Sequence, residues 1–119
     1  MDRIPIVKVG DFLLATVQAD VQDNVALALQ EDLGNRIIAT RARLVLFDIS
    51  GLQIVDSFIG RLVADIAAIA KLLDAEVIVV GMQPAVAITL VELGLTLKGV
   101  RTALNVESAL AMAGNREPD

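Results

Sequence analysis

Apolar residues in this chain occur either as short continuous runs or as longer segments in which they recur every three or four positions. The runs 4–9 ("IPIVKV") and 12–17 ("FLLATV") are separated by Gly10-Asp11, and this arrangement predicts a β-hairpin. The next segment, from Asp23 to about Thr40, has an apolar residue at every fourth position. It predicts a helix with Asp23 as its N-cap. The apolar stripe of this helix consists of Val25, Leu29, Leu33 and Ile37.

The rest of the chain alternates between strands and helices. Leu44–Phe47 and Val77–Val80 are wholly apolar, as expected of strands that are covered on both faces. A third short strand is predicted at "VRTAL", residues 100–104. Further helices are predicted from about Asp56 to Leu73, from Pro84 to a stop at Gly94, and from the cap residue Asn105 to about Ala113.

These elements have the order ββαβαβαβα. Helices that alternate with buried strands imply a mostly parallel sheet, to which the opening hairpin adds an antiparallel pair. We therefore expect one α/β domain over residues 1–119, with a mixed sheet packed against helices. The polar residues 114–119 are expected to form a frayed tail.

Composition adds an expectation of self-association. Of the 119 residues, 55% are hydrophobic and 21% are charged, so the chain has apolar residues beyond those that a core needs. The most apolar window, residues 58–82, does not predict a membrane span, because five charged residues interrupt it. The first residues also lack an apolar run long enough for a signal peptide, and we expect a cytoplasmic protein. The interrupting charges are Arg61, Asp65, Lys71, Asp74 and Glu76.

Several kinds of chemistry are disfavoured by the residues that the chain lacks. It has no cysteine and no histidine, which removes thiolate nucleophiles, the commonest metal ligands and the usual proton shuttle. No glycine-rich phosphate-binding loop is present. A net charge of −5 argues against binding to nucleic acid. We therefore expect a protein that is not an enzyme and that needs no metal or cofactor.

Two serines lie in the segment "DISGLQIVDSFIG", residues 48–60. Ser50 follows a strand and precedes a glycine, as turn residues do. Ser57 follows Asp56 at a predicted helix start, where capping alone explains both residues. An exposed hydroxyl at this place is also suited to phosphorylation, which would add about −1.5 to −2 charges. A partner packed over residues 55–59, on Val55, Phe58 and Ile59, would then be displaced. The local pattern leaves both interpretations open.

The order of the elements, the acidic strand end at Asp48 and the "DS" that opens the second long helix resemble STAS domains. The segments "QEDLGNRI", "IVDSFIGRL" and "GMQPAVAITLVELGL" resemble, more narrowly, the RsbS-type single-domain subunits of the bacterial stressosome. The likeness covers essentially the whole chain.

This resemblance implies a non-enzymatic antagonist and scaffold with one phosphoacceptor. An RsbT-type serine kinase is expected to be held by the unmodified protein and to phosphorylate Ser57, with Asp56, Val55, Phe58 and Ile59 forming the surrounding partner surface. RsbR-type STAS paralogues are the implied assembly partners, and a serine phosphatase is the implied resetting enzyme. Ser50 remains a turn residue.

Two other functions stay open at this point. Phe58-Ile59 stands where simpler antagonists have a small residue and a glycine, which questions a direct role as a stand-alone antagonist of an anti-sigma factor. A STAS module that binds a nucleotide or another small ligand would need a pocket with a cationic contact. Lys8 and Lys98 are the candidates for that contact.

Overall fold

The fold is taken from a computed structural model, which describes residues 4–17, 21–52, 56–94 and 100–114. In these segments the strands form one sheet whose spatial order is β1-β2-β3-β4-β5. The first pair is antiparallel and the other pairs are parallel, which confirms the mixed, mostly parallel sheet. The strands are β1 (Ile6–Val9), β2 (Phe12–Thr16), β3 (Leu44–Asp48), β4 (Glu76–Val80) and β5 (Arg101–Ala103).

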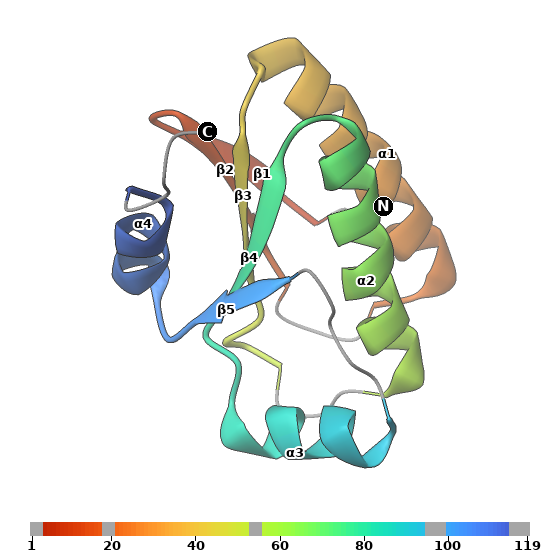
Figure 1. Cartoon of the computed structure of the whole chain (residues 1–119). Helices are drawn as coiled ribbons and strands as arrows, with labels where there is room; N and C mark the ends of the chain where they lie inside the picture. The colour runs from red at the N-terminus through yellow and green to blue at the C-terminus, as the bar shows by residue number, and fades with distance from the viewer. Residues whose placement is uncertain (1–3, 18–20, 53–55, 95–99, 115–119) are drawn as a thin grey trace.

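The helices are distributed unevenly around this sheet (Figure 1). Helices α1 and α2 lie side by side on one face, and α4 lies on the other. Helix α3 lies across the end of the molecule at which α2 begins. Right-handed crossovers that step in one direction along a sheet place their helices on the same face, as α1 and α2 are placed. The bounds are α1 (Asp23–Thr40), α2 (Ser57–Leu72), α3 (Pro84–Glu92) and α4 (Val106–Gly114).

The opening hairpin forms as the sequence predicts. Val9 pairs with Phe12, so Gly10 and Asp11 make a two-residue turn between β1 and β2. Gly10 has a φ of 56°, which is left-handed backbone that glycine adopts without steric cost. The tight turn fixes the register of the antiparallel pair.

One helix cap and one helix start confirm the sequence predictions, and one cap corrects them. The Asn105 side chain accepts a hydrogen bond of 2.8 Å from the Ser108 backbone N–H, so Asn105 caps α4 as expected. Pro84 is the first residue of α3. The N-cap of α1, however, is Gln22, with extended backbone and no hydrogen bond from its side chain. Asp23 is instead the first helical residue, where its carboxylate lies favourably at the positive end of the helix dipole.

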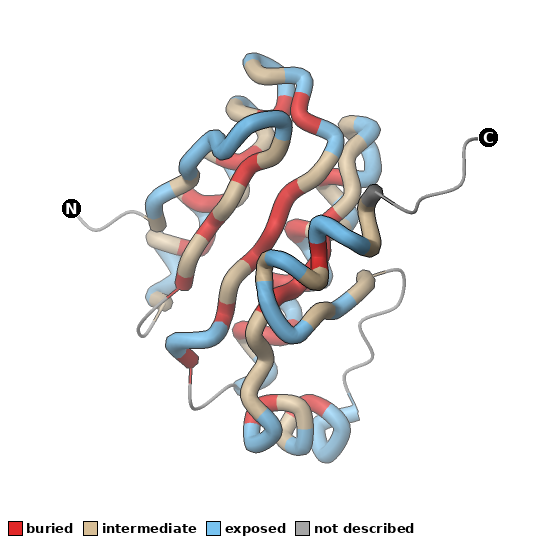
Figure 2. The backbone as a smooth tube through the Cα atoms, turned by 90° about the vertical axis from the view of Figure 1, so that its left-hand side faces the viewer, coloured by how far each residue is buried: buried red, intermediate tan, exposed pale blue. Residues whose placement is uncertain are grey.

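The core has one cluster of buried residues on each side of the central strands. On β3, Val45 and Phe47 belong to the cluster under α1 and α2, whereas Leu46 belongs to the cluster under α4. The prediction that this strand is covered on both faces is therefore confirmed. Figure 2 shows buried residues running through the middle of the sheet. Among the described residues, no helix combines the length and the apolar character needed to cross a membrane.

The tail predicted at residues 114–119 lies almost wholly outside the described residues. Gly114 is the last residue of α4.

Candidate functional site

Ser57 is the first residue of α2, and its side chain lies in solvent. The preceding residue, Asp56, is the N-cap, as the sequence predicts. Its Oδ1 accepts a hydrogen bond of 3.1 Å from the Ile59 backbone N–H. The cap satisfies one of the N–H groups that a helix start leaves without an intrahelical partner. The Ser57 hydroxyl is thus held at the positive end of a 16-residue helix and remains accessible from outside.

The residues around Ser57 differ in how much surface they offer. Phe58 is half-buried and packs against the core beneath α1 and α2. Ile59 is only 9% exposed and belongs to that core, so its side chain adds little to the surface around Ser57, and its contact with a partner stays a prediction. Its position one turn before Val63 points its side chain inward. Val55 lies outside the described residues.

Ser50 lies in a turn that closes on the end of β3. The Asp48 Oδ1 atom accepts a hydrogen bond of 2.9 Å from the Ser50 backbone N–H, which is the local side-chain bonding expected of a turn aspartate. The Ser50 backbone carbonyl accepts a second hydrogen bond, of 2.8 Å, from Nε2 of Gln83. This second contact joins the loop after β3 to the loop after β4, and sequence reasoning missed it.

Gly81 makes the close approach of these two loops sterically feasible. Its φ is 75°, and a Cβ built on it would lie 2.7 Å from the Ser50 Cβ and 3.4 Å from Asp48 Oδ1. Real Cβ atoms do not approach a neighbouring carbon so closely. Glycine is therefore required here both by backbone conformation and by space. A glycine directly after a buried strand was the signal in the sequence that could have located this contact.

A groove of about 360 Å³ runs between α1 and α2 beside Phe58. Its charged lining consists of Asp23 from α1 and of Arg61 and Asp65 from α2. The apolar lining includes Leu27, which is 65% exposed. The flank of α2 that faces α1 is therefore both polar and apolar, and it contains a cation.

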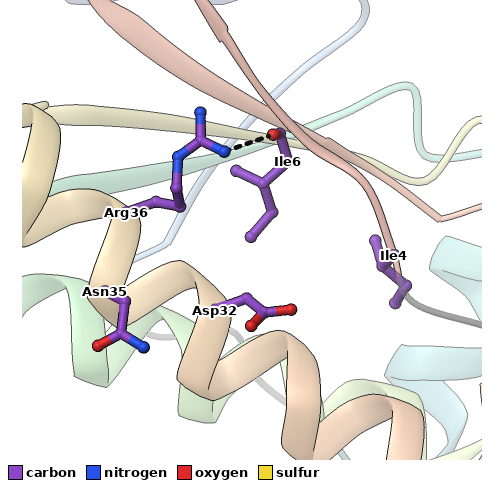
Figure 3. A pocket seen from close by; sticks show the side chains of 5 residues that line it. All are labelled: Ile4, Ile6, Asp32, Asn35 and Arg36. Atoms are coloured by element: carbon purple, nitrogen blue, oxygen red, sulfur yellow. Dashed lines mark hydrogen bonds between the residues drawn. The ribbon is translucent and has the colours of Figure 1, made fainter.

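A separate cavity of about 240 Å³ lies between β1 and α1 (Figure 3). The Arg36 guanidinium reaches over it and donates a hydrogen bond of 3.2 Å to the Ile6 backbone carbonyl. Binding sites for small molecules usually measure about 300–1,000 Å³. Lys8 is not among the lining residues, and Lys98 lies outside the described residues. The cavity is smaller than such sites and the Arg36 cation over it is already bonded to the Ile6 carbonyl, so it offers little support for a ligand-binding function. Its lining is completed by Ile4, Asp32 and Asn35.

One half of a sheet face forms an apolar surface, which we call the sheet patch. Val7 and Val9 of β1 are 52% and 42% exposed. Their register partners Leu14 and Phe12 are half-buried and face the same side as the core cluster under α4. Helix α4 packs over β3, β4 and β5. It therefore covers mainly the other half of this sheet face. The sheet patch consists of Val7, Val9, Phe12, Leu14 and the neighbouring Leu44 of β3.

Comparison with known proteins gives one family match and several relatives. A model of the STAS domain matches residues 3–109. The chain is 29% identical over 111 residues to the RsbT co-antagonist protein RsbRD of Bacillus subtilis. That match covers 92% of this chain and 40% of the relative, so the chain spans less than half of that protein's length.

Two solved structures resemble the chain along nearly its whole length. The first is RsbS of Moorella thermoacetica with a serine replaced by glutamate. It is 36% identical, with a TM-score of 0.80, and the match covers 94% of this chain and 95% of that one. The second comes from the molecular architecture of the stressosome, described as a signal integration and transduction hub. It is 37% identical, with a TM-score of 0.82, and the match covers 93% of this chain and 96% of that one.

Proposed function

The chain belongs to the STAS-domain family, and from this premise we propose that it is a non-enzymatic antagonist and scaffold subunit of a stressosome-type assembly. In this proposal the unmodified protein holds an RsbT-type serine kinase. The kinase phosphorylates Ser57, loses its affinity for the product and is released to act on a downstream target. A serine phosphatase restores the original state.

The observation that carries the proposal is the position of Ser57. Its hydroxyl is exposed at the first residue of α2, and the adjacent N-cap is already supplied by Asp56. A kinase can therefore reach this serine without breaking a structural contact made by its side chain in the described part of the molecule. Ser50 is exposed as well, but it lies in a turn whose backbone is held by a local hydrogen bond to Asp48 and by a hydrogen bond from Gln83 of the next loop.

Charge explains how one phosphate acts on a partner and leaves the fold intact. A phosphate on Ser57 lies at a helix N-terminus, where backbone N–H groups and the helix dipole stabilise an anion. The same phosphate lies next to the exposed Asp56 carboxylate. A partner that covered both anions would have to remove them from water, which is unfavourable unless each is paired. Binding is thus weakened while the host protein stays folded.

Assembly with other STAS subunits is the second part of the proposal. The relative RsbRD is named as an RsbT co-antagonist, and one of the similar solved structures comes from the stressosome. The sheet patch supplies apolar surface of the kind that subunit interfaces bury. We assign this surface to contacts with RsbR-type paralogues or with further copies of the chain. A large complex on size-exclusion chromatography with an RsbR-type partner distinguishes this function from that of a stand-alone antagonist of an anti-sigma factor.

The test of the kinase step uses the protein, an RsbT-type kinase and labelled ATP. The wild-type chain and Ser50→Ala are expected to take up one phosphate, whereas Ser57→Ala takes up none. Ser57→Glu, with Ser50→Glu as its control, is expected to lose kinase capture without a change in thermal unfolding. Full phosphate incorporation into Ser57→Ala would refute the site. Unchanged capture by Ser57→Glu, together with unchanged capture by the phosphorylated wild type, would refute the switch.

A further inference from the structure

Arg61 lies one helical turn after the phosphoacceptor serine. It follows Ser57 by four residues within α2, and both residues are exposed. Residues four apart lie on the same side of a helix, with about 5–6 Å between their Cβ atoms. The rotamers that are common in helices direct a long side chain toward the N-terminus of its helix. From position 61, such a side chain reaches the turn that Ser57 begins.

The Arg61 guanidinium is available for a new partner. Within the described segments of the chain it takes part in neither an ion pair nor a hydrogen bond. Arg36, Arg43 and Arg101, by contrast, are each bound to a carbonyl or a carboxylate. A phosphate that formed beside Arg61 would therefore not have to break an existing contact of the guanidinium with the described residues.

Asp65 is the anion that competes for Arg61. It follows Arg61 by four residues and lines the groove between α1 and α2 together with it. A helical ion pair at this spacing is stronger when the acidic residue precedes the basic one. A phosphate on Ser57 has this favoured order, whereas Asp65 has the reverse order. The phosphate also carries about −1.5 to −2 charges, against one on a carboxylate. Arg61 should therefore bind the phosphate in preference to Asp65.

We propose that Arg61 binds the phosphate of phosphorylated Ser57 through charge-assisted hydrogen bonds within α2. This inference rests on the proposed function and adds a counter-ion that holds the phosphate on its own helix after the kinase has acted. The guanidinium supplies one positive charge, so a net negative charge remains beside Asp56. A partner that covered this place would still have to remove an anion from water.

The same contact carries the effect of phosphorylation to the groove between α1 and α2. Arg61, Asp23 and Asp65 are the charged residues that line this groove. When the guanidinium turns toward the phosphate, the two carboxylates lose their nearest positive charge. The groove thus becomes more acidic when Ser57 is modified.

The test introduces phosphoserine at position 57 of the full chain by genetic code expansion, so that it does not depend on the kinase. A ³¹P NMR titration measures the second pKa of the phosphate. This pKa is expected to be higher in Arg61→Gln than in the parent by about 0.4, because a neighbouring cation favours the dianion. The matched control is Lys71→Gln, which removes the same charge from an exposed residue of α2 that lies about 21 Å further along the helix. The control is expected to leave the pKa of the phosphate unchanged.

The other charged groups described near the phosphate are present in the parent and in both variants. They are Asp56 and Asp65 of α2 and Asp23 of α1. The comparison of the two variants therefore isolates the cation at position 61. A second readout is the ¹⁵N signal of the Arg61 Nε–H group, which is expected to shift with the same midpoint as the phosphate. Thermal unfolding verifies that both variants remain folded.

An equal rise of the phosphate pKa in both variants, or no rise in either, overturns the inference. If the titration fails in this way while an RsbT-type kinase still modifies Ser57, the proposed function stands and the role of Arg61 is refuted. If the kinase leaves Ser57 unmodified, the proposed function fails and the inference fails with it.

Discussion

The side-chain amide of Gln83 donates a hydrogen bond of 2.8 Å to the backbone carbonyl of Ser50. The two residues are 33 positions apart in the chain, and each follows a strand of the central pair. The Asp48 carboxylate accepts the Ser50 N–H at 2.9 Å, so the turn after β3 is held from both sides. This turn lies in the chain between β3 and α2.

Replacing Gln83 with leucine is expected to lower the free energy of unfolding by about 1 kcal/mol, since it removes a hydrogen bond of ordinary strength. Urea denaturation measures this difference. Gln22→Leu is the control, because Gln22 also lies directly before a helix but makes no capping hydrogen bond with its side chain. Equal stability of the two variants would mean that the contact between the loops contributes nothing.

Two glycines with left-handed backbone are expected to respond differently to alanine. Gly81→Ala must accommodate both a φ of 75° and a Cβ at 2.7 Å from the Ser50 Cβ, and should cost at least about 2 kcal/mol. A Cβ added at Gly10 would have no atom within 4 Å, at a φ of 56°. Gly10→Ala should therefore cost only the backbone strain of a left-handed alanine, about 1 kcal/mol. The measurement is thermal unfolding of both variants. A larger loss of stability in Gly10→Ala than in Gly81→Ala would contradict the close contact described at Gly81.

Removal of the α2 cap is expected to destabilise the helix start. Asp56→Ala leaves the Ile59 N–H without its acceptor and should lower stability by about 1 kcal/mol. Asp56→Asn keeps an acceptor oxygen and should stay within a few tenths of the wild type. Chemical denaturation measures both variants. Hydrogen exchange in the first turn of α2 should accelerate in Asp56→Ala alone, and equal exchange in both variants would exclude the cap as the cause.

The Arg101–Glu76 pair allows a prediction of how the stability of the protein depends on pH. Arg101 donates hydrogen bonds of 2.7 and 2.8 Å to the two carboxylate oxygens, and these bonds raise the pKa of Arg101 above its usual value. Because the pKa is raised in the folded state, the pair contributes fully to the free energy of unfolding below the ordinary pKa of arginine. This contribution is lost only as the pH rises above that value. Because the Arg101 side chain is 38% exposed, solvent screening limits the stabilisation by this ion pair to about 1 kcal/mol or less.

We therefore expect Arg101→Gln to be destabilised by the same small amount at pH 7 and pH 9, as measured by urea denaturation. Added salt should reduce the difference between the variant and the wild type. A loss that disappeared between these two pH values would exclude the arginine as its source.

Most of the fold was predictable because local signals agree with the tertiary structure. Gly10-Asp11 predicts the hairpin by turn chemistry, and Asn105 predicts the cap of α4 by its side-chain acceptor. The cap of α1 was predicted one residue too late. Aspartate is favourable both at the cap and in the first turn, so its presence alone does not fix the boundary.

The site was predictable only in part. Asp56 and Ser57 predict a helix start in the sequence, and in the structure α2 begins at Ser57 with Asp56 as its N-cap. The inward direction of Ile59 depends on which side of α2 faces the sheet, and two adjacent apolar residues, Phe58 and Ile59, leave that choice open. The Gln83–Ser50 contact depends on the pairing of Asp48 with Val80, which brings two distant loops to one edge. Such a register is a property of the assembled sheet.

The spatial order of the strands repeats their order along the chain. Each strand that leaves the ribosome therefore finds its neighbour already synthesised, and the sheet can grow at one edge during translation. Sequential pairing also keeps contacting segments near one another in the chain, which favours rapid folding. Helix α4 is the last described element along the chain, and it packs on the face of the sheet opposite α1 and α2, so that face is the last to be covered.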